Sequence, residues 1–315
     1  MLTRRTAMTL AAAGALSACG PHGRAGKSAR VRIGYQKNGV LLLAKSRGQF
    51  AAALPGVDIE WSEFVSGPPL LEALAAGAVD LGATGDAPPL FAQAAGAPLR
   101  YVAVQPLTGQ SEAILVPKDS TLTGAEQLRG KLVAFTKGSS SHLLVVKALA
   151  KAGLSLADIQ PIHLSPADAS SAFATGSLDA WATWDPYLAL AQRDQAARVL
   201  IDGSAVARSD AFLLASARLV EDAPAVLARV LDALRVEAAW GAAHRPDLIR
   251  IVSQANGLPP EIVAAGLRRG RLAVEPVTAE VVARQQASAD IFAKLGEIPK
   301  TIKVADAAWT GWTPR

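Results

Sequence analysis

The chain has 315 residues, half of them apolar and 19% charged, which suits a globular protein with one large domain or two lobes. Lysine and arginine exceed the acidic residues by five, and their scatter, without a basic block interleaved with aromatic residues, argues against nucleic-acid binding. The histidines are far apart and only one cysteine is present, so we expect no metal site, no cofactor and no disulfide within one copy.

Residues 1–19 are predicted to be an export signal. Arg4 and Arg5 precede a short apolar stretch at 6–16, whereas a span across a bilayer needs roughly 20 apolar residues. The end of the stretch, 16–19, resembles the lipobox of bacterial lipoproteins and predicts lipidation of Cys19. Ordinary cleavage nearby would instead leave Cys19 as a free thiol. Residues 20–29 are polar and glycine-rich, as in a flexible tether.

Short apolar runs then alternate with helix-like segments. The predicted strands of this part are 31–35, 57–64, 79–84 and 99–105, and the predicted helices are 40–50, 68–76 and 86–95. The rhythm repeats with strands at 113–117, 131–135, 159–164, 180–183 and 198–201 and with helices at 142–152 and after Ser165. Such alternation predicts parallel or mixed sheets that are covered by helices.

An internal echo indicates two similar lobes. Residues 77–86 and 176–185 are identical at five of ten positions, and each stretch follows an amphipathic helix and precedes a helix start that contains proline. Helical segments at 223–243, 245–255, 260–268 and 280–295 must pack on one lobe or bridge both.

We therefore predict an α/β fold with two lobes and two hinge crossovers, around 113–117 and 209–212. Residues 30–115 and 210–315 would form the first lobe, to which the C-terminal helices return. Residues 116–209 would form the second lobe.

Two strand ends followed by helix starts are candidate anion sites, because helix N-termini offer unpaired N–H groups and a partial positive charge. In the first, Gly138 lets the backbone approach a ligand, and Ser139, Ser140 and Ser141 add hydroxyls to an anion-binding nest. One serine alone would more simply cap the helix. We interpret His142 as a helix-surface residue and not as a base.

The second candidate site contributes Thr84, Gly85 and backbone N–H groups, with Asp86 as the N-cap before two prolines. Its counterpart in the echo contains Trp184, which either packs against a ligand or lies in the core. An acid well placed for an ammonium group would favour a ligand that carries one, such as taurine, and Asp185 is the candidate for this role.

The end of the first strand adds a polar rim to these sites. Gln36 and Lys37 form this rim, although Lys37 could equally be a solvated loop residue.

Catalysis has little support in the sequence. No metalloprotease motif or phosphate-binding loop is present, and the stretch 138–142 begins like a nucleophile elbow but ends in histidine. A serine hydrolase with Ser140 as nucleophile is the alternative from another functional class, and we expect no enzyme activity.

Several stretches resemble the aliphatic-sulfonate-binding proteins of ABC importers: 33–37, 71–74, 79–89, 91–97, 137–142, 164–169 and 179–187. The resemblance implies a type II periplasmic-binding-protein fold and permease and ATPase partners that serve sulfur metabolism. Together with the predicted export signal and lipidation of Cys19, it leads us to expect a periplasmic monomer that is anchored to a membrane. The resemblance also implies alkanesulfonate binding by Gln36, Gly85, Asp86, Ser139, Ser140, His142, Trp184 and Asp185. Taurine, nitrate and a thiamine-precursor pyrimidine are alternative ligands for the same fold.

Overall fold

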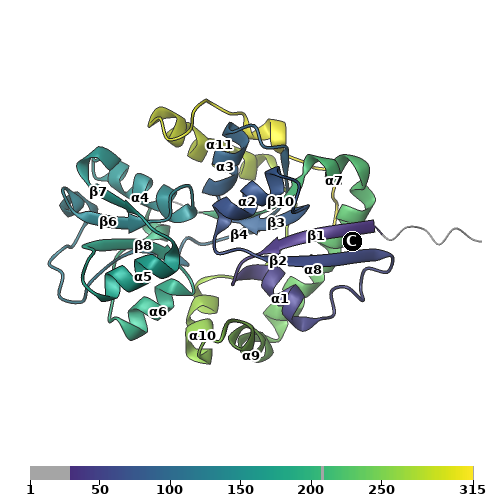
Figure 1. Cartoon of the computed structure of the whole chain (residues 1–315), viewed down its shortest axis with the longest axis horizontal. Coiled ribbons are helices and arrows are strands. Elements are labelled where there is room, and N and C mark those ends of the chain that lie inside the picture. The colour runs from purple at the N-terminus through teal and green to yellow at the C-terminus, as the bar shows by residue number, and fades with distance from the viewer. Residues whose placement is uncertain (1–28, 207–208, 315) are drawn as a thin grey trace, which may run out of the picture.

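The computed structural model describes residues 29–206 and 209–314, which form two five-stranded mixed sheets with helices on their faces (Figure 1). The strand orders are β2-β1-β3-β10-β4 and β7-β6-β8-β5-β9. In each sheet the first three strands of this spatial order run parallel to one another. The fourth strand runs antiparallel to them, and the fifth, at the edge, pairs antiparallel with the fourth. The matching topologies confirm the predicted α/β fold with two similar lobes.

Lobe 1 is the first sheet with its helices. Its strands are β1 Ala29–Tyr35, β2 Val57–Glu63, β3 Leu81–Thr84, β4 Leu99–Pro106 and β10 Asp210–Ser216. The helices between them are α1 Gly39–Arg47, α2 Gly67–Ala75 and α3 Ala87–Ala94. Helix α1 ends before the predicted residue 50 because Gly48 takes a left-handed conformation, with φ of 68°, and its N–H bonds back to the Lys45 carbonyl.

Lobe 2 is the second sheet with its helices. Its strands are β5 Glu112–Val116, β6 Leu132–Phe135, β7 Gln160–His163, β8 Ala180–Trp184 and β9 Arg198–Asp202. The helices are α4 Ser140–Lys151, α5 Pro166–Ala174 and α6 Tyr187–Asp194. Ser165 caps α5, as predicted, by accepting a hydrogen bond from the Asp168 N–H. Three short 3-10 helices among the described residues of this lobe are η1 Ala125–Leu128, η2 Leu156–Asp158 and η3 Gly203–Ala205, whereas η4 Val304–Ala307 packs on α11 and β4 of lobe 1.

After β10 the chain stays on lobe 1 as helices α7 Ala217–Asp222, α8 Pro224–Ala243, α9 Arg245–Asn256, α10 Pro260–Arg269 and α11 Ala279–Lys294. Helix α8 packs with α1 in one core cluster, through Leu227 and Leu231, and α11 packs with α3 in another, through Phe292. Helix α10 also contacts α6, so it reaches lobe 2 (Figure 1).

The first crossover lies earlier than predicted. β5 pairs with β8 and β9 from Glu112 to Val116 and therefore belongs wholly to the second sheet. The chain changes sheet at 107–111, and the boundary that we predicted after residue 115 falls inside β5. The sequence of this strand is apolar and does not indicate which sheet it joins. The predicted signal, Cys19 and all of the predicted tether except Ala29, which opens β1, lie outside the described residues.

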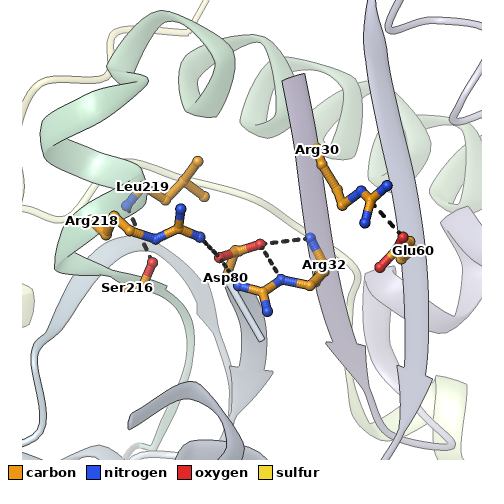
Figure 2. Close-up of polar contacts among 7 residues, drawn as sticks. All are labelled: Arg30, Arg32, Glu60, Asp80, Ser216, Arg218 and Leu219. Carbon is orange, nitrogen blue, oxygen red and sulfur yellow. Dashed lines mark hydrogen bonds and ion pairs between the residues drawn. The ribbon is translucent and has the colours of Figure 1, made fainter. Parts of the chain in front are cut away.

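The aspartates that recur in the two echoed stretches, Asp80 and Asp179, bond to the backbone of a neighbouring strand. Asp80 is 2% exposed and accepts hydrogen bonds from the Arg32 backbone N–H (3.0 Å), the Arg32 guanidinium (2.8 and 2.9 Å) and Arg218 (2.8 Å) (Figure 2). Asp179 likewise accepts from the Leu132 N–H of β6, at 2.8 Å. Burial would raise the pKa of Asp80, but the hydrogen bonds and charges of the two arginines hold it below its usual value.

We predict that Asp80→Asn lowers the unfolding free energy by about 2–3 kcal/mol near neutral pH, because the three charge-assisted hydrogen bonds from Arg32 and Arg218 are weakened. Asp179→Asn should cost about 1 kcal/mol or less, since the Asp179 side chain is 40% exposed. Because the folded-state pKa of Asp80 is lowered, the difference from wild type should persist above about pH 4 and shrink below it. Urea unfolding of both variants tests this, and equal losses would contradict it.

Candidate functional site

A cavity of about 210 Å³ lies between the two lobes. One water needs about 10–15 Å³ of such volume, so the cavity has room for a small organic molecule. Its walls come from the segments after β1, β3, β6 and β8 and from α9 and α10. The carboxyl ends of parallel strands from both sheets therefore face one cavity, as is common for ligand sites in α/β proteins.

Nine of the eleven residues predicted for ligand binding line this cavity: Gln36, Lys37, Thr84, Gly85, Asp86, Ser139, Ser140, Trp184 and Asp185. The two predicted helix starts meet there. A Cβ atom placed on Gly85 would lie 3.0 Å from Cβ and 3.2 Å from Oγ of Ser140, so the missing side chain at residue 85 allows the starts of α3 and α4 to touch.

Two of the three serine hydroxyls are used inside the turn before α4. The Ser139 hydroxyl donates to the Thr136 carbonyl (2.7 Å) and lies 2.9 Å from the Ser141 hydroxyl, which accepts from the Thr136 N–H (3.2 Å). Ser141 is fully buried and does not line the cavity. Of the three hydroxyls that we expected in the nest, only that of Ser140 is not engaged within the turn, and Ser140 lines the cavity.

His142 is not a helix-surface residue, as we had expected, but is 1% exposed. Its Nδ1 accepts from the Gly138 N–H (3.2 Å), and its ring stacks on Phe135 and packs against Phe292 of α11. Nε2 lies 3.6 Å from the Glu297 carboxylate, and His142 does not line the cavity. Burial lowers the pKa of His142 to about 4, so the ring is neutral at pH 7 and serves the packing of lobe 2 on lobe 1.

Asp86 stands at the N-cap position of α3 but makes no capping hydrogen bond, and its buried Oδ1 has no hydrogen-bond partner in the described part of the chain. Burial raises the pKa of Asp86 to about 6, against the opposing charge of Lys147. Burial also raises the pKa of Glu112 to about 8. Both carboxyl groups line the cavity, and desolvation favours their protonated forms.

Two further carboxylates at the cavity are held by arginines. Asp185 Oδ1 accepts from Arg269 at 2.7 Å, and Asp210 Oδ2 accepts from Arg284 at 2.9 Å. The cavity is thus acidic in composition, yet much of its negative charge is compensated or suppressed. This compensation makes the cavity compatible with an anion.

Trp184 lines the cavity and is half-buried, whereas the neighbouring Trp181 is 1% exposed and belongs to the core of lobe 2. Of the two alternatives for Trp184, the structure thus selects the position at the cavity. The side chain of Lys37 is 53% exposed and lies 3.8 Å from Glu63, so its ammonium group is solvated at the rim.

Sequence analysis did not predict the apolar wall of the cavity, which is formed by α1, α9, α10, the turn between α9 and α10 and the segment after α10. Its apolar residues are Val40, Leu41, Leu248, Val252, Leu258, Ile262, Val263, Leu267 and Leu272. We had treated these helices as packing elements only. One available signal was Leu258, an apolar residue in the turn between Gly257 and Pro259, where no helical periodicity accounts for it.

Within 29–206 and 209–314, no helix has the length and hydropathy needed to cross a bilayer. The same residues contain no group of three or more side chains placed to hold a metal ion.

A family model described as NMT1/THI5 like matches residues 37–247. The chain belongs to this NMT1/THI5-like family. Its fold is similar to that of the alkanesulfonate-binding protein of Xanthomonas axonopodis pv. citri bound to MOPS, with 43% identity, a TM-score of 0.87, and coverage of 90% of this chain and 99% of that chain. It is also similar to the periplasmic aliphatic sulphonate binding protein of Escherichia coli, with 42% identity, a TM-score of 0.82, and coverage of 91% of this chain and 92% of that chain.

A taurine-binding periplasmic protein of Escherichia coli K12 is more distant, at 27% identity over 180 residues, 57% of this chain and 55% of that protein.

The similarity to the two sulfonate-binding structures confirms the predicted resemblance and the periplasmic-binding-protein fold. The range matched by the NMT1/THI5-like family contains every predicted cavity residue except Gln36, and it ends before α10.

We predict that His142 makes folding sensitive to acid. The unfolded imidazole binds a proton with a pKa of about 6.5, whereas the buried one does so at about 4, so the folded state should lose stability as pH falls from about 6.5 to about 4. His142→Asn, which keeps an acceptor for Gly138, should lack this loss. Urea unfolding at several pH values tests this, and parallel pH profiles of the two proteins would contradict it.

Proposed function

We propose that this protein is the extracytoplasmic solute-binding component of an ABC importer and binds an aliphatic sulfonate in the cavity between its lobes. The observation that carries the proposal is the contact of two helix starts, at Gly85 and Ser140, in a cavity whose other wall is apolar. A ligand with an anionic head and an apolar tail fits both walls.

The head group would be held by neutral donors. A sulfonate is permanently charged and accepts hydrogen bonds, and the start of α4 offers backbone N–H groups and the Ser140 hydroxyl. One helix terminus contributes about 0.3–2 kcal/mol and one hydrogen bond to a charged group about 1.5–3, whereas micromolar binding needs about 8 kcal/mol. Donors from both lobes are therefore needed, which supports capture by closure of the two lobes.

The tail would pack on the apolar wall and on Trp184. Each buried methylene contributes about 0.8 kcal/mol, which corresponds to about fourfold in affinity. Nitrate has no tail and would leave the wall unused. An apolar wall of this size therefore favours an organic sulfonate over a small inorganic anion.

A serine hydrolase is the weaker alternative. Ser140 faces the cavity, but the neighbouring His142 is engaged with Gly138 and directed to Glu297, away from the cavity. A nucleophilic serine needs a base within hydrogen-bond reach. We therefore infer binding without turnover.

The relatives named above as periplasmic support a periplasmic location, with a permease and an ATPase as partners. In this proposal residues 1–19 direct export, Cys19 carries the lipid anchor, and the protein acts as a monomer. Mass spectrometry of the N-terminal peptide of the mature protein would test the lipid anchor. An unmodified Cys19, or cleavage at another position, would contradict it.

We predict that affinity rises about fourfold per methylene along methane-, propane- and pentanesulfonate, until the tail fills the wall, and that sulfate and nitrate bind weakly. Isothermal titration measures each dissociation constant. Ile262→Ser should flatten the dependence on tail length, because Ile262 lies on the wall. Leu295→Ser, at a 43% exposed residue off the cavity, is the control. Tighter binding of nitrate than of any alkanesulfonate would contradict the proposal.

A further inference from the structure

The Asp185 carboxylate lies between the cavity and α10. Asp185 lines the cavity, and its Oδ1 accepts from the Ala189 N–H (3.2 Å) and from the Arg269 guanidinium (2.7 Å). Its Oδ2 is buried and has no hydrogen-bond partner among the described residues. The side chain is only 13% exposed, so this carboxylate has lost most of its water and depends on Arg269 for compensation.

Arg269 compensates this charge from outside the cavity. It is the last residue of α10 and does not line the cavity, although its neighbours Gly270 and Arg271 do. Its guanidinium also bonds to Gln192 of α6, and its carbonyl accepts from the Thr108 hydroxyl at 2.9 Å. The guanidinium is therefore held behind Asp185 by two side chains of lobe 2, while the helix that carries Arg269 is anchored at its end by Thr108 of the crossover.

Helix α10 brings Asp185 against the apolar wall. A Cβ atom placed on Gly266 would lie 3.2 Å from both Cβ and Cγ of Asp185, so the helix backbone touches this side chain. Gly266 lines the cavity beside the wall residues Ile262 and Val263. A ligand tail that lies on this wall comes close to the Asp185 carboxylate.

An uncompensated carboxylate here would attract an ammonium group on the tail. Paired with Arg269, it has no net charge to offer, and an ammonium would lose its water without gaining a partner. An apolar tail of the same length carries no charged group and therefore loses no ammonium hydration when it lies on the wall. The Asp185–Arg269 pair therefore favours an apolar tail over a cationic one.

We propose that Arg269 is a specificity-determining residue, which excludes aminosulfonates such as taurine by neutralising Asp185 from behind the cavity. This inference rests on the proposed binding of sulfonates. It goes further by assigning the discrimination between two sulfonate classes to one ion pair outside the cavity lining.

The test uses two ligands of matched shape, propane-1-sulfonate and taurine, which differ by a methyl against an ammonium group. Isothermal titration at about pH 8, well above the usual pKa of an aspartate, gives the ratio of the two dissociation constants for each protein. The wild type should prefer propane-1-sulfonate. Arg269→Gln should shift the ratio towards taurine by about tenfold or more, because it leaves a buried carboxylate facing the tail.

Matched variants separate the effect of the Arg269 charge from the effect of a changed structure. Arg269→Lys keeps the charge and should keep the wild-type preference. The double variant Arg269→Gln/Asp185→Asn should lose the gain for taurine, because the carboxylate is gone. Should Arg269→Gln not fold, as judged by thermal unfolding, Arg269→Met with its apolar stem replaces it in both comparisons.

An equal loss of affinity for both ligands in Arg269→Gln would overturn the inference, because Arg269 would then have only a structural role. A double variant that keeps the taurine gain would also overturn it. If the wild type binds propane-1-sulfonate and the ratio stays unchanged in the variants, only the role of Arg269 fails. If the wild type binds neither sulfonate, the proposed function fails and the inference with it.

Discussion

The contact between Gly85 and Ser140 is the constraint on which the site depends. These residues belong to different lobes and follow strands of different sheets, yet a Cβ atom on Gly85 would approach Ser140 to 3.0 Å. Any side chain at residue 85 would hold the starts of α3 and α4 apart. Because each helix start provides only a small part of the free energy that an anion needs, their contact is what makes a shared site possible.

Charge compensation is the second condition for anion binding in this cavity. Asp185 and Asp210 are paired with Arg269 and Arg284, whereas burial favours the protonated forms of Asp86 and Glu112. Neither arginine lines the cavity. The cations that compensate Asp185 and Asp210 therefore lie behind the cavity surface, in α10 and α11.

The sequence predicted the parts of the fold that repeat. Asp80 and Asp179 recur in the echoed stretches because each accepts a hydrogen bond from the backbone of the neighbouring parallel strand, β1 for Asp80 and β6 for Asp179. The hydroxyls of Ser139 and Ser141 could not be placed, since their direction depends on the backbone angles of the turn before α4. The wall on α9 and α10 was missed because it depends on where these helices dock and not on their own periodicity.

A crystal structure of the chain with propane-1-sulfonate would test the shared anion site most directly. We expect sulfonate oxygens within hydrogen-bond distance of N–H groups at the starts of both α3 and α4, next to Gly85 and Ser140. A sulfonate bound at the rim by Lys37 or Arg271, with no contact to either helix start, would contradict it.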